Sequence, residues 1–305
     1  MTSTTTVSTN GPFSGLRRMI SAEMLKLGSR TMTKVFLIII VAIIVLANLL
    51  IFAATKNATV AGPGATGTGG MGPLHNDLLS SAIPSALSIF SFFGLFLAAI
   101  FTASSVGNEY GWKTIRTELI SAESRFKFLT AKLVSITIFI FAGMVIAVAV
   151  GFITRFIVVG VNGESLSLGF FTGAYAWNQA LDFLRTFFII MPYGLLAFLM
   201  AIVGRSAMPG TATSIGVFFL ETIVTGIMSG VHGWISHVPD YLFSANVSAI
   251  QRLNNQSSSV QINGNGGAGA SVLPSVPHAI IVLSLYSLVF LVLGYYLFKK
   301  RDVTG

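Results

Sequence analysis

Long uncharged apolar runs constrain the fold of this chain more than any other feature. The first, Val35 to Ala54, has twenty residues without a charge, and as a helix it can cross about 30 Å of hydrocarbon. Backbone polar groups inside a bilayer must be satisfied internally, so runs of this length predict transmembrane helices. The chain contains six apolar runs of membrane-spanning length, with predicted bounds 35–54, 83–106, 133–153, 183–203, 211–228 and 279–298.

The composition agrees with this interpretation. Only 9% of the 305 residues are charged and 53% are apolar, whereas soluble domains carry about 25% charged residues. A chain this apolar cannot cover a globule with a hydrated surface, so we expect an all-α integral membrane protein. The net charge of +8 is attributed to residues that set membrane topology rather than to nucleic-acid binding. The chain has no Cys, which excludes disulfides and thiolate chemistry.

Three regions are predicted along the chain. Residues 1–12 are rich in Ser and Thr and are expected to be disordered. Residues 13–34 are predicted to form an amphipathic helix that lies in the membrane interface and contacts lipid; the alternative is a helix packed on soluble protein. Residues 35–301 are predicted to form one six-span domain. The apolar stripe of the amphipathic helix consists of Leu16, Ile20, Met24 and Leu27.

The distribution of basic residues predicts the topology. Six spans place both termini on one side of the membrane. Fourteen of the 18 Lys and Arg residues fall in the N-terminal segment, the connection between spans two and three, the turn between spans four and five, and the C-terminal tail. Because cytoplasmic loops carry the excess of basic residues, both termini and the connection between spans two and three are predicted to be cytoplasmic.

That connection, from Asn108 to Leu133, is the most polar part of the chain. Eight of its first 25 residues are charged. A short helix is predicted in which Trp112, Ile115 and Leu119 share one face, and Ser121 to Ser124 is expected to end it and cap the next helix. Such a short helix is marginal in water, so the pattern favours docking on a partner. A solvated loop that anchors the spans by charge is the alternative, and Arg125, Lys127 and Lys132 are assigned to such anchoring at the membrane interface.

The order of residues in this stretch resembles the permease signature of ABC transporters of the second exporter type. The resemblance covers about 25 residues: Glu109-Tyr110-x-Trp112-x-Thr114-x-Arg116-Thr117-x-Leu119-Ile120, then Ser124-Arg125 and Ala131-Lys132-Leu133. Lys113 departs from the pattern, because the family usually has Gly before the Thr. The resemblance implies a cytoplasmic coupling helix that fits a cleft on the ATP-binding subunit. The residues it assigns to ATPase coupling are Glu109, Trp112, Thr114, Ile115, Arg116, Leu119 and Arg125.

The resemblance also implies the partners. The sequence lacks the Gly-x-x-x-x-Gly-Lys-Ser/Thr motif of a P-loop, so ATP is expected to bind to a separate ABC ATPase subunit and not to this chain. The chain itself is expected to be non-catalytic and to need no cofactor. It would act in the cell membrane as an exporter permease, paired with a second copy or a paralogue.

Two polar residues inside the predicted spans are candidates for a translocation path. Glu221 lies near the middle of the fifth span and Asn48 in the first. A carboxylate at such depth is costly and should face the bundle interior; the alternatives are a structural role for Glu221 and interhelical hydrogen bonding for Asn48. The rival function is therefore an ion-coupled secondary transporter or channel that uses Glu221. Two weaker patterns are Asp182 with Arg185, interpreted as an interfacial anchor, and His232 and His237 with Asp240, a weak metal pattern.

Overall fold

The computed structural model describes residues 12–60, 77–112, 124–161, 168–228, 238–255 and 274–300. Within these ranges all regular structure is helical, and six helices are long and apolar enough to cross a membrane. The predicted all-helical architecture is therefore confirmed within the described residues, with six candidate membrane spans. The helices are α1 (Pro12–Ser29), α2 (Thr31–Val60), α3 (Asp77–Ser80), α4 (Ala82–Gly111), α6 (Arg125–Val161), α7 (Gly173–Gly204), α8 (Ala207–Met228), α9 (Phe243–Asn255) and α10 (Val276–Lys300), with a 3-10 turn at Pro239–Tyr241.

The membrane-spanning helices α2, α4, α6, α7, α8 and α10 each contain one of the predicted apolar runs and extend beyond it. The largest extension is in α6, which has 37 residues. Its start is fixed by Ser124, whose Oγ accepts a hydrogen bond of 3.1 Å from the backbone N–H of Lys127. This is the side-chain cap that the Ser-rich turn predicts.

Helices α4 and α7 form the centre of the bundle. In each, 67% of the most apolar window is buried inside the chain, against 11% for α8 and for α10. The close approach of α8 to α4 depends on small residues. At Gly107 in α4, a Cβ atom would lie 2.0 Å from the backbone N of Ala207, the first residue of α8. The turn between α7 and α8 therefore packs backbone to backbone on the last turns of α4.

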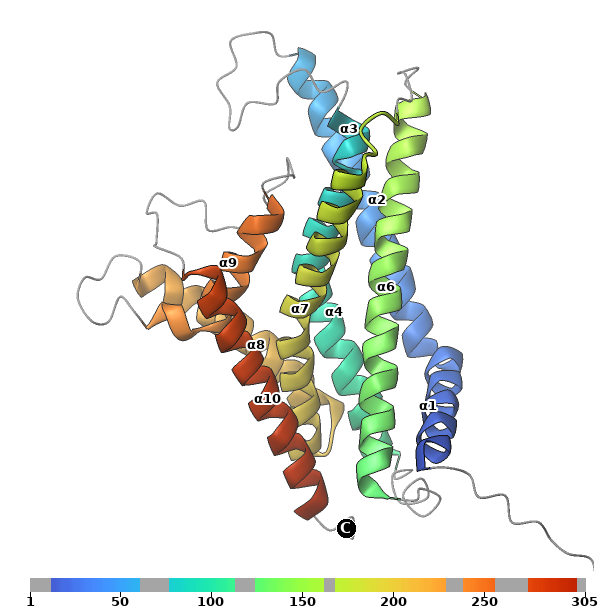
Figure 1. Ribbon diagram of the computed structural model, residues 1–305, viewed down its shortest axis with the longest axis vertical. Coiled ribbons are helices and arrows are strands. Elements are labelled where there is room, and N and C mark those ends of the chain that lie inside the picture. The colour runs from blue at the N-terminus through green and yellow to red at the C-terminus, as the bar shows by residue number, and fades with distance from the viewer. Residues whose placement is uncertain are drawn as a thin grey trace, which may run out of the picture.

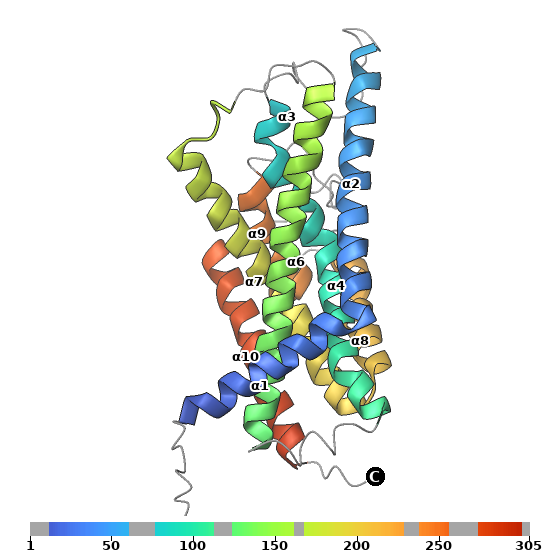
Figure 2. The same cartoon turned by 90° about the vertical axis from the view of Figure 1, so that its right-hand side faces the viewer.

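Helix α1 lies across one end of α6 (Figure 2). Its apolar stripe faces the protein: Leu27 is buried, and Leu16 and Ile20 are half-buried, while Arg17 and Arg18 are exposed on the other side. The apolar stripe thus packs on α6 of the same chain, an arrangement that neither the interfacial prediction nor the alternative of packing on soluble protein described. Contact of the exposed basic side with lipid stays a prediction.

Helix α9 was not predicted, because its 13 residues lie in a connection rich in Ser, Asn and Gly. It contacts α4, α7, α8 and α10 (Figure 1). Phe243, Val247 and Ile250 are buried and belong to the main hydrophobic core. These positions recur at steps of four and three, which is the period of a helix with one buried face.

The basic segments meet at one end of the bundle, which we call the basic end. Helix α1, the C-terminal end of α4, the start of α6, the α7–α8 turn and the C-terminal end of α10 all lie there (Figure 1). This is the arrangement that the distribution of Lys and Arg requires for a six-span chain.

Candidate functional site

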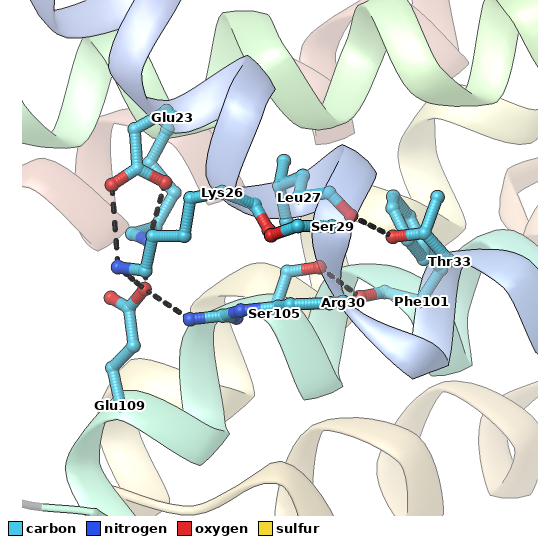
Figure 3. Close-up of polar contacts among 10 residues, drawn as sticks. Glu23, Lys26, Leu27, Ser29, Arg30, Thr33, Phe101, Ser105 and Glu109 are labelled. Atoms are coloured by element: carbon cyan, nitrogen blue, oxygen red, sulfur yellow. Dashed lines mark hydrogen bonds and ion pairs between the residues drawn. The ribbon is translucent and has the colours of Figure 1, made fainter.

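Glu109 is the centre of a buried ionic cluster at the basic end. It lies in the last turn of α4, immediately before residues 113–123, and its side chain is 0% exposed. Its Oε1 atom is 2.6 Å from Lys26 Nζ, 3.1 Å from Arg30 Nη2 and 2.5 Å from Lys132 Nζ. The cations come from α1, from the α1–α2 corner and from α6, so one carboxylate joins three helical segments. Figure 3 shows Lys26 and Arg30 beside Glu109.

A second carboxylate completes the cluster. Glu23 of α1 contacts Lys132 Nζ at 3.1 Å through Oε2 and Lys26 Nζ at 3.5 Å through Oε1. Glu23, Lys26 and Arg30 are spaced by three and four residues, which places them on one face of a helix. The cluster thus contains two carboxylates and three cationic side chains. Charged groups removed from water need such pairing, because an isolated buried charge is very costly.

The corner between α1 and α2 holds Arg30 in position. The Thr33 hydroxyl donates to the carbonyl oxygen of Leu27 over 2.5 Å, and the backbone N–H of Arg30 bonds to the same carbonyl at 3.3 Å. These bonds close the turn where the chain passes from α1 into α2 (Figure 3).

Trp112 connects this cluster to the solvent-exposed surface. It is the last described residue before residues 113–123, and its side chain is 62% exposed. The Arg30 guanidinium lies over its ring, with Cζ 5.4 Å from the ring centroid, a distance at which cation–π attraction operates. Arg30 therefore contacts the buried Glu109 and the exposed Trp112 at once.

The structure brings together some of the predicted coupling residues. Glu109 and Trp112 share Arg30 as a partner. Arg125 lies elsewhere at the basic end, where its Nη1 donates to the carbonyl oxygen of Lys299 at 3.4 Å. The remaining predicted residues, and the coupling helix itself, lie outside the described ranges: Thr114, Ile115, Arg116 and Leu119.

The structure adds partners for Lys132 that the sequence did not predict. Its position at the membrane interface stays a prediction, and its side chain is 1% exposed and contacts Glu109 and Glu23. A lysine this buried needs carboxylate partners, and it finds them on two other helices. The cluster was missed because its partners are 23 to 109 positions apart in the sequence. The spacing of Glu23, Lys26 and Arg30 on one helical face was the available signal.

The carboxylate of Glu221 is hydrogen-bonded to the N-terminus of α9. Its Oε1 accepts from the backbone N–H of Phe243 at 3.2 Å, and its Oε2 accepts from the N–H of Ser244 at 2.8 Å. These are the first N–H groups of α9, which have no partner within that helix. A carboxylate at a helix N-terminus is also favoured by the helix dipole. Glu221 thus caps α9 from α8, a role that matches the structural alternative for this residue.

Asn48 belongs to a separate polar cluster. Its Nδ2 donates to the Ile44 carbonyl at 2.8 Å, and its Oδ1 accepts from Arg155 Nε at 2.7 Å. Arg155 also donates to the hydroxyls of Ser81 at 2.9 Å and Ser85 at 3.1 Å. These bonds tie α2 and the start of α4 to α6, so Asn48 acts between helices as its alternative role predicts.

The two weaker patterns have different outcomes. Asp182 Oδ1 and Arg185 Nη1 are 2.9 Å apart, so the predicted pair forms. His232 and His237 lie outside the described residues, and within the described ranges no group of three or more His, Cys, Asp or Glu residues is placed to hold a metal.

Comparison with known proteins gives two matches. A family described as "Protein of unknown function (DUF2705)" matches residues 69–304. The "Uncharacterized protein YhcI" of Bacillus subtilis (strain 168) is 24% identical over 220 residues, which is 70% of this chain. The match spans 65% of the length of that relative. Because the family match covers most of the sequence, this chain belongs to the DUF2705 family.

Proposed function

We propose that this chain is the membrane-spanning permease subunit of an ATP-driven exporter. The observation that carries the proposal is the ionic cluster on Glu109, which lies at the start of the stretch that resembles the ABC permease signature. Through it, α1, α4 and α6 share one buried carboxylate directly before residues 113–123. A movement of residues 113–123 would be transmitted to α1, α4 and α6 together. This is what a contact with a moving ATPase subunit requires.

The mechanism follows from the rigidity of these contacts. A separate ATPase subunit would dock on the cytoplasmic side, on residues 113–123 and the exposed Trp112. Movement of the docked subunit would displace the ends of α4 and α6 together, because Glu109 and Lys132 are ion-paired. Helix α1 would follow through Lys26 and Arg30. The chain would bind no ATP itself, and both termini would be cytoplasmic.

A second copy or a paralogue completes the proposed transporter. Helix α8 buries only 11% of its most apolar window within the chain. Phe219, Leu220 and Ile223 are exposed on it, and aromatic contacts join α8 to α4, with Phe96 and Phe218 at 4.8 Å between ring centroids. We propose that this face of α4 and α8 meets the second permease and borders the path of the substrate.

The rival function, an ion-coupled transporter or channel that uses Glu221, receives less support. Both carboxylate oxygens of Glu221 are engaged by backbone N–H groups of α9. A side chain that holds a helix in place is poorly suited to bind and release an ion in each cycle. An ATP-independent flux that depends on an ion gradient would nevertheless favour this rival.

Co-purification tests the proposed docking. A neighbouring gene for a Walker-motif ATPase would supply the partner to test; its product is co-expressed with the chain, and its recovery with the chain in mild detergent is measured. Changing Trp112→Ala together with Leu119→Ala should reduce the recovered ATPase at least about tenfold, because an anchoring Trp typically contributes about 2 kcal/mol or more. Trp177→Ala is the matched control, since Trp177 is 66% exposed on α7, away from the basic end. Undiminished recovery of the ATPase with the double variant would refute the docking role.

A further inference from the structure

The start of α6 and the end of α10 lie side by side at the basic end (Figures 1 and 2). The Arg125 Nη1 atom donates to the carbonyl oxygen of Lys299 at 3.4 Å, and the rings of Phe126 and Tyr295 are 4.9 Å apart between centroids. The Tyr295 hydroxyl is 2.8 Å from the hydroxyl of Thr130, one turn further along α6. We call this surface the α6–α10 junction, and it consists of Arg125, Phe126, Tyr295, Tyr296, Lys299 and Lys300.

The last turn of α10 brings two exposed lysines to the junction. Lys299 and Lys300 follow Tyr295 and Tyr296 at a spacing of four, which places each lysine on the same face as a tyrosine. The Nζ atom of Lys300 is 5.7 Å from the centroid of the Tyr296 ring, a distance at which cation–π attraction operates. Within the part of the chain that the structure describes, neither ammonium group is in an ion pair with a carboxylate.

An apolar stripe leads from the span to these charges. Leu288, Val292, Tyr296 and Lys300 follow one another at steps of four along one side of α10. The first three are 59%, 58% and 55% exposed. From Leu288 to Lys300 the helix rises about 18 Å, which is close to half of the hydrocarbon thickness of about 30 Å. The stripe therefore has the length of one leaflet and ends in a positive charge.

The helix dipole explains only part of this arrangement. Cations in the last turn of a helix are favoured by its dipole, which accounts for the position of Lys299 and Lys300. The dipole of α10 does not account for exposed aromatic rings on both helices, where Phe126 is 65% exposed. Aromatic rings are typical of the membrane–water interface, and basic clusters at that level bind anionic lipid headgroups.

We propose that the α6–α10 junction binds an anionic phospholipid from the leaflet at the basic end. The phosphate group lies at Lys299 and Lys300, and an acyl chain lies along the apolar stripe of α10. A soluble anion or a soluble protein leaves that stripe uncovered, so the apolar surface favours a lipid. The bound lipid adds to the contacts that hold the start of α6 against the end of α10. This site is separate from α1, for which contact with lipid is predicted from its exposed basic side.

The experiment uses the purified full-length chain in mild detergent without any ATPase, so its outcome does not depend on the proposed function. Phosphatidylglycerol and phosphatidylcholine with identical acyl chains are titrated, and native mass spectrometry counts the lipids that the chain retains. We expect phosphatidylglycerol to bind at lower concentration, because only its headgroup has a net negative charge. Lys299→Gln with Lys300→Gln should weaken the apparent affinity for the first bound phosphatidylglycerol about 25-fold, since each basic residue near an anionic lipid surface contributes a factor of about five.

Matched variants separate this site from general attraction by charge. Arg17→Gln with Arg18→Gln removes the same charge from exposed positions of α1 and should leave the affinity for the first phosphatidylglycerol unchanged. Lys299→Arg with Lys300→Arg keeps the charge and should retain binding, which excludes a folding defect as the cause of a loss.

Four results would overturn the proposal. Phosphatidylcholine could bind as tightly as phosphatidylglycerol, or the two Gln variants could weaken phosphatidylglycerol equally. Inorganic phosphate could displace the lipid, in which case the junction recognises a free anion. The Lys299→Gln, Lys300→Gln chain could keep its affinity for phosphatidylglycerol and lose a co-expressed ATPase, in which case the junction contacts a protein. None of the first three results bears on the docking of an ATPase at residues 113–123.

Discussion

Glu109 and Glu221 are both buried carboxylates on membrane-spanning helices, yet the chain compensates them by different means. Glu109 is 0% exposed and is in contact with three cationic side chains. Glu221 is 6% exposed, and within the described ranges its contacts are two backbone N–H groups at the start of α9 rather than a cation. Glu109 is paired with full positive charges at the basic end. Glu221 interacts with the partial positive charge at the N-terminus of α9, inside the bundle.

The difference indicates where each region tolerates change. Removal of Glu109 takes one of two carboxylates from a cluster with three cationic side chains. Removal of the charge on Glu221 takes a carboxylate from two backbone N–H groups, which carry only partial charges. Packing follows the same division. The helix that carries Glu109 touches the backbone of α8 at Gly107, while Gly216 and Gly226 on either side of Glu221 have no neighbouring atom within 4 Å of an added Cβ. The basic end is thus tightly constrained, and the middle of α8 is not.

The largest expected effect is that of Glu109→Leu. It removes one of the two carboxylates that contact Lys132, which is 1% exposed and keeps its contact with Glu23 at 3.1 Å. Removing one partner of a buried ion pair costs about 3–5 kcal/mol, and the remaining contact with Glu23 places this variant near the lower end of that range. Denaturant unfolding of the purified chain in detergent measures the loss. The double change Glu109→Leu with Lys132→Leu should recover most of it, because the buried ammonium is then removed together with the carboxylate. If the loss of unfolding free energy in the double variant equalled the sum of the losses in the two single variants, Glu109 and Lys132 would not be coupled.

A smaller effect is expected from Gly107→Ala. The new Cβ would lie 2.0 Å from Ala207 N and 2.3 Å from its Cα, and backbone atoms cannot move aside as a side chain does. Overpacking of this kind costs about 1–3 kcal/mol. Gly160→Ala in α6 is the control, because no atom lies within 4 Å of its added Cβ. It should be neutral or stabilising by up to about 1 kcal/mol through helix propensity. Equal thermal unfolding midpoints for both variants would contradict the difference in packing.

The smallest effect is expected from Glu221→Gln. The amide oxygen can still accept a hydrogen bond from one N–H of α9, so the loss should be about 0.5–2 kcal/mol, the usual range for a helix cap. Hydrogen exchange should increase in residues 243–255 and remain unchanged in α1. Thr222→Ala is the neighbouring control, since its hydroxyl donates only to the Phe218 carbonyl within α8. Destabilisation as large as that of Glu109→Leu would show that the two carboxylates are not compensated differently.

The sequence was sufficient to predict what depends on local patterns. Apolar runs predicted six spanning helices, and the Ser-rich turn predicted the cap on α6. Contacts between distant positions were not predictable in this way. Nothing near Lys132 in sequence indicates that Glu23, 109 positions earlier, is its partner. Helix α9 was missed because it is short and has no apolar run, and its stability comes from Glu221 and from burial between other helices.

Helix α6 carries two of the buried cations described above, Lys132 and Arg155. They are 23 residues apart in one uninterrupted helix, which corresponds to about 35 Å along its axis. This separation slightly exceeds the hydrocarbon thickness of a bilayer, about 30 Å. Sliding α6 along its axis in either direction would therefore draw one of these charges away from its oxygen partners toward the lipid interior. The two buried cations therefore hold α6 near both faces of the bilayer and oppose its translation along the helix axis. Tilting and rotation of α6 are the movements that remain.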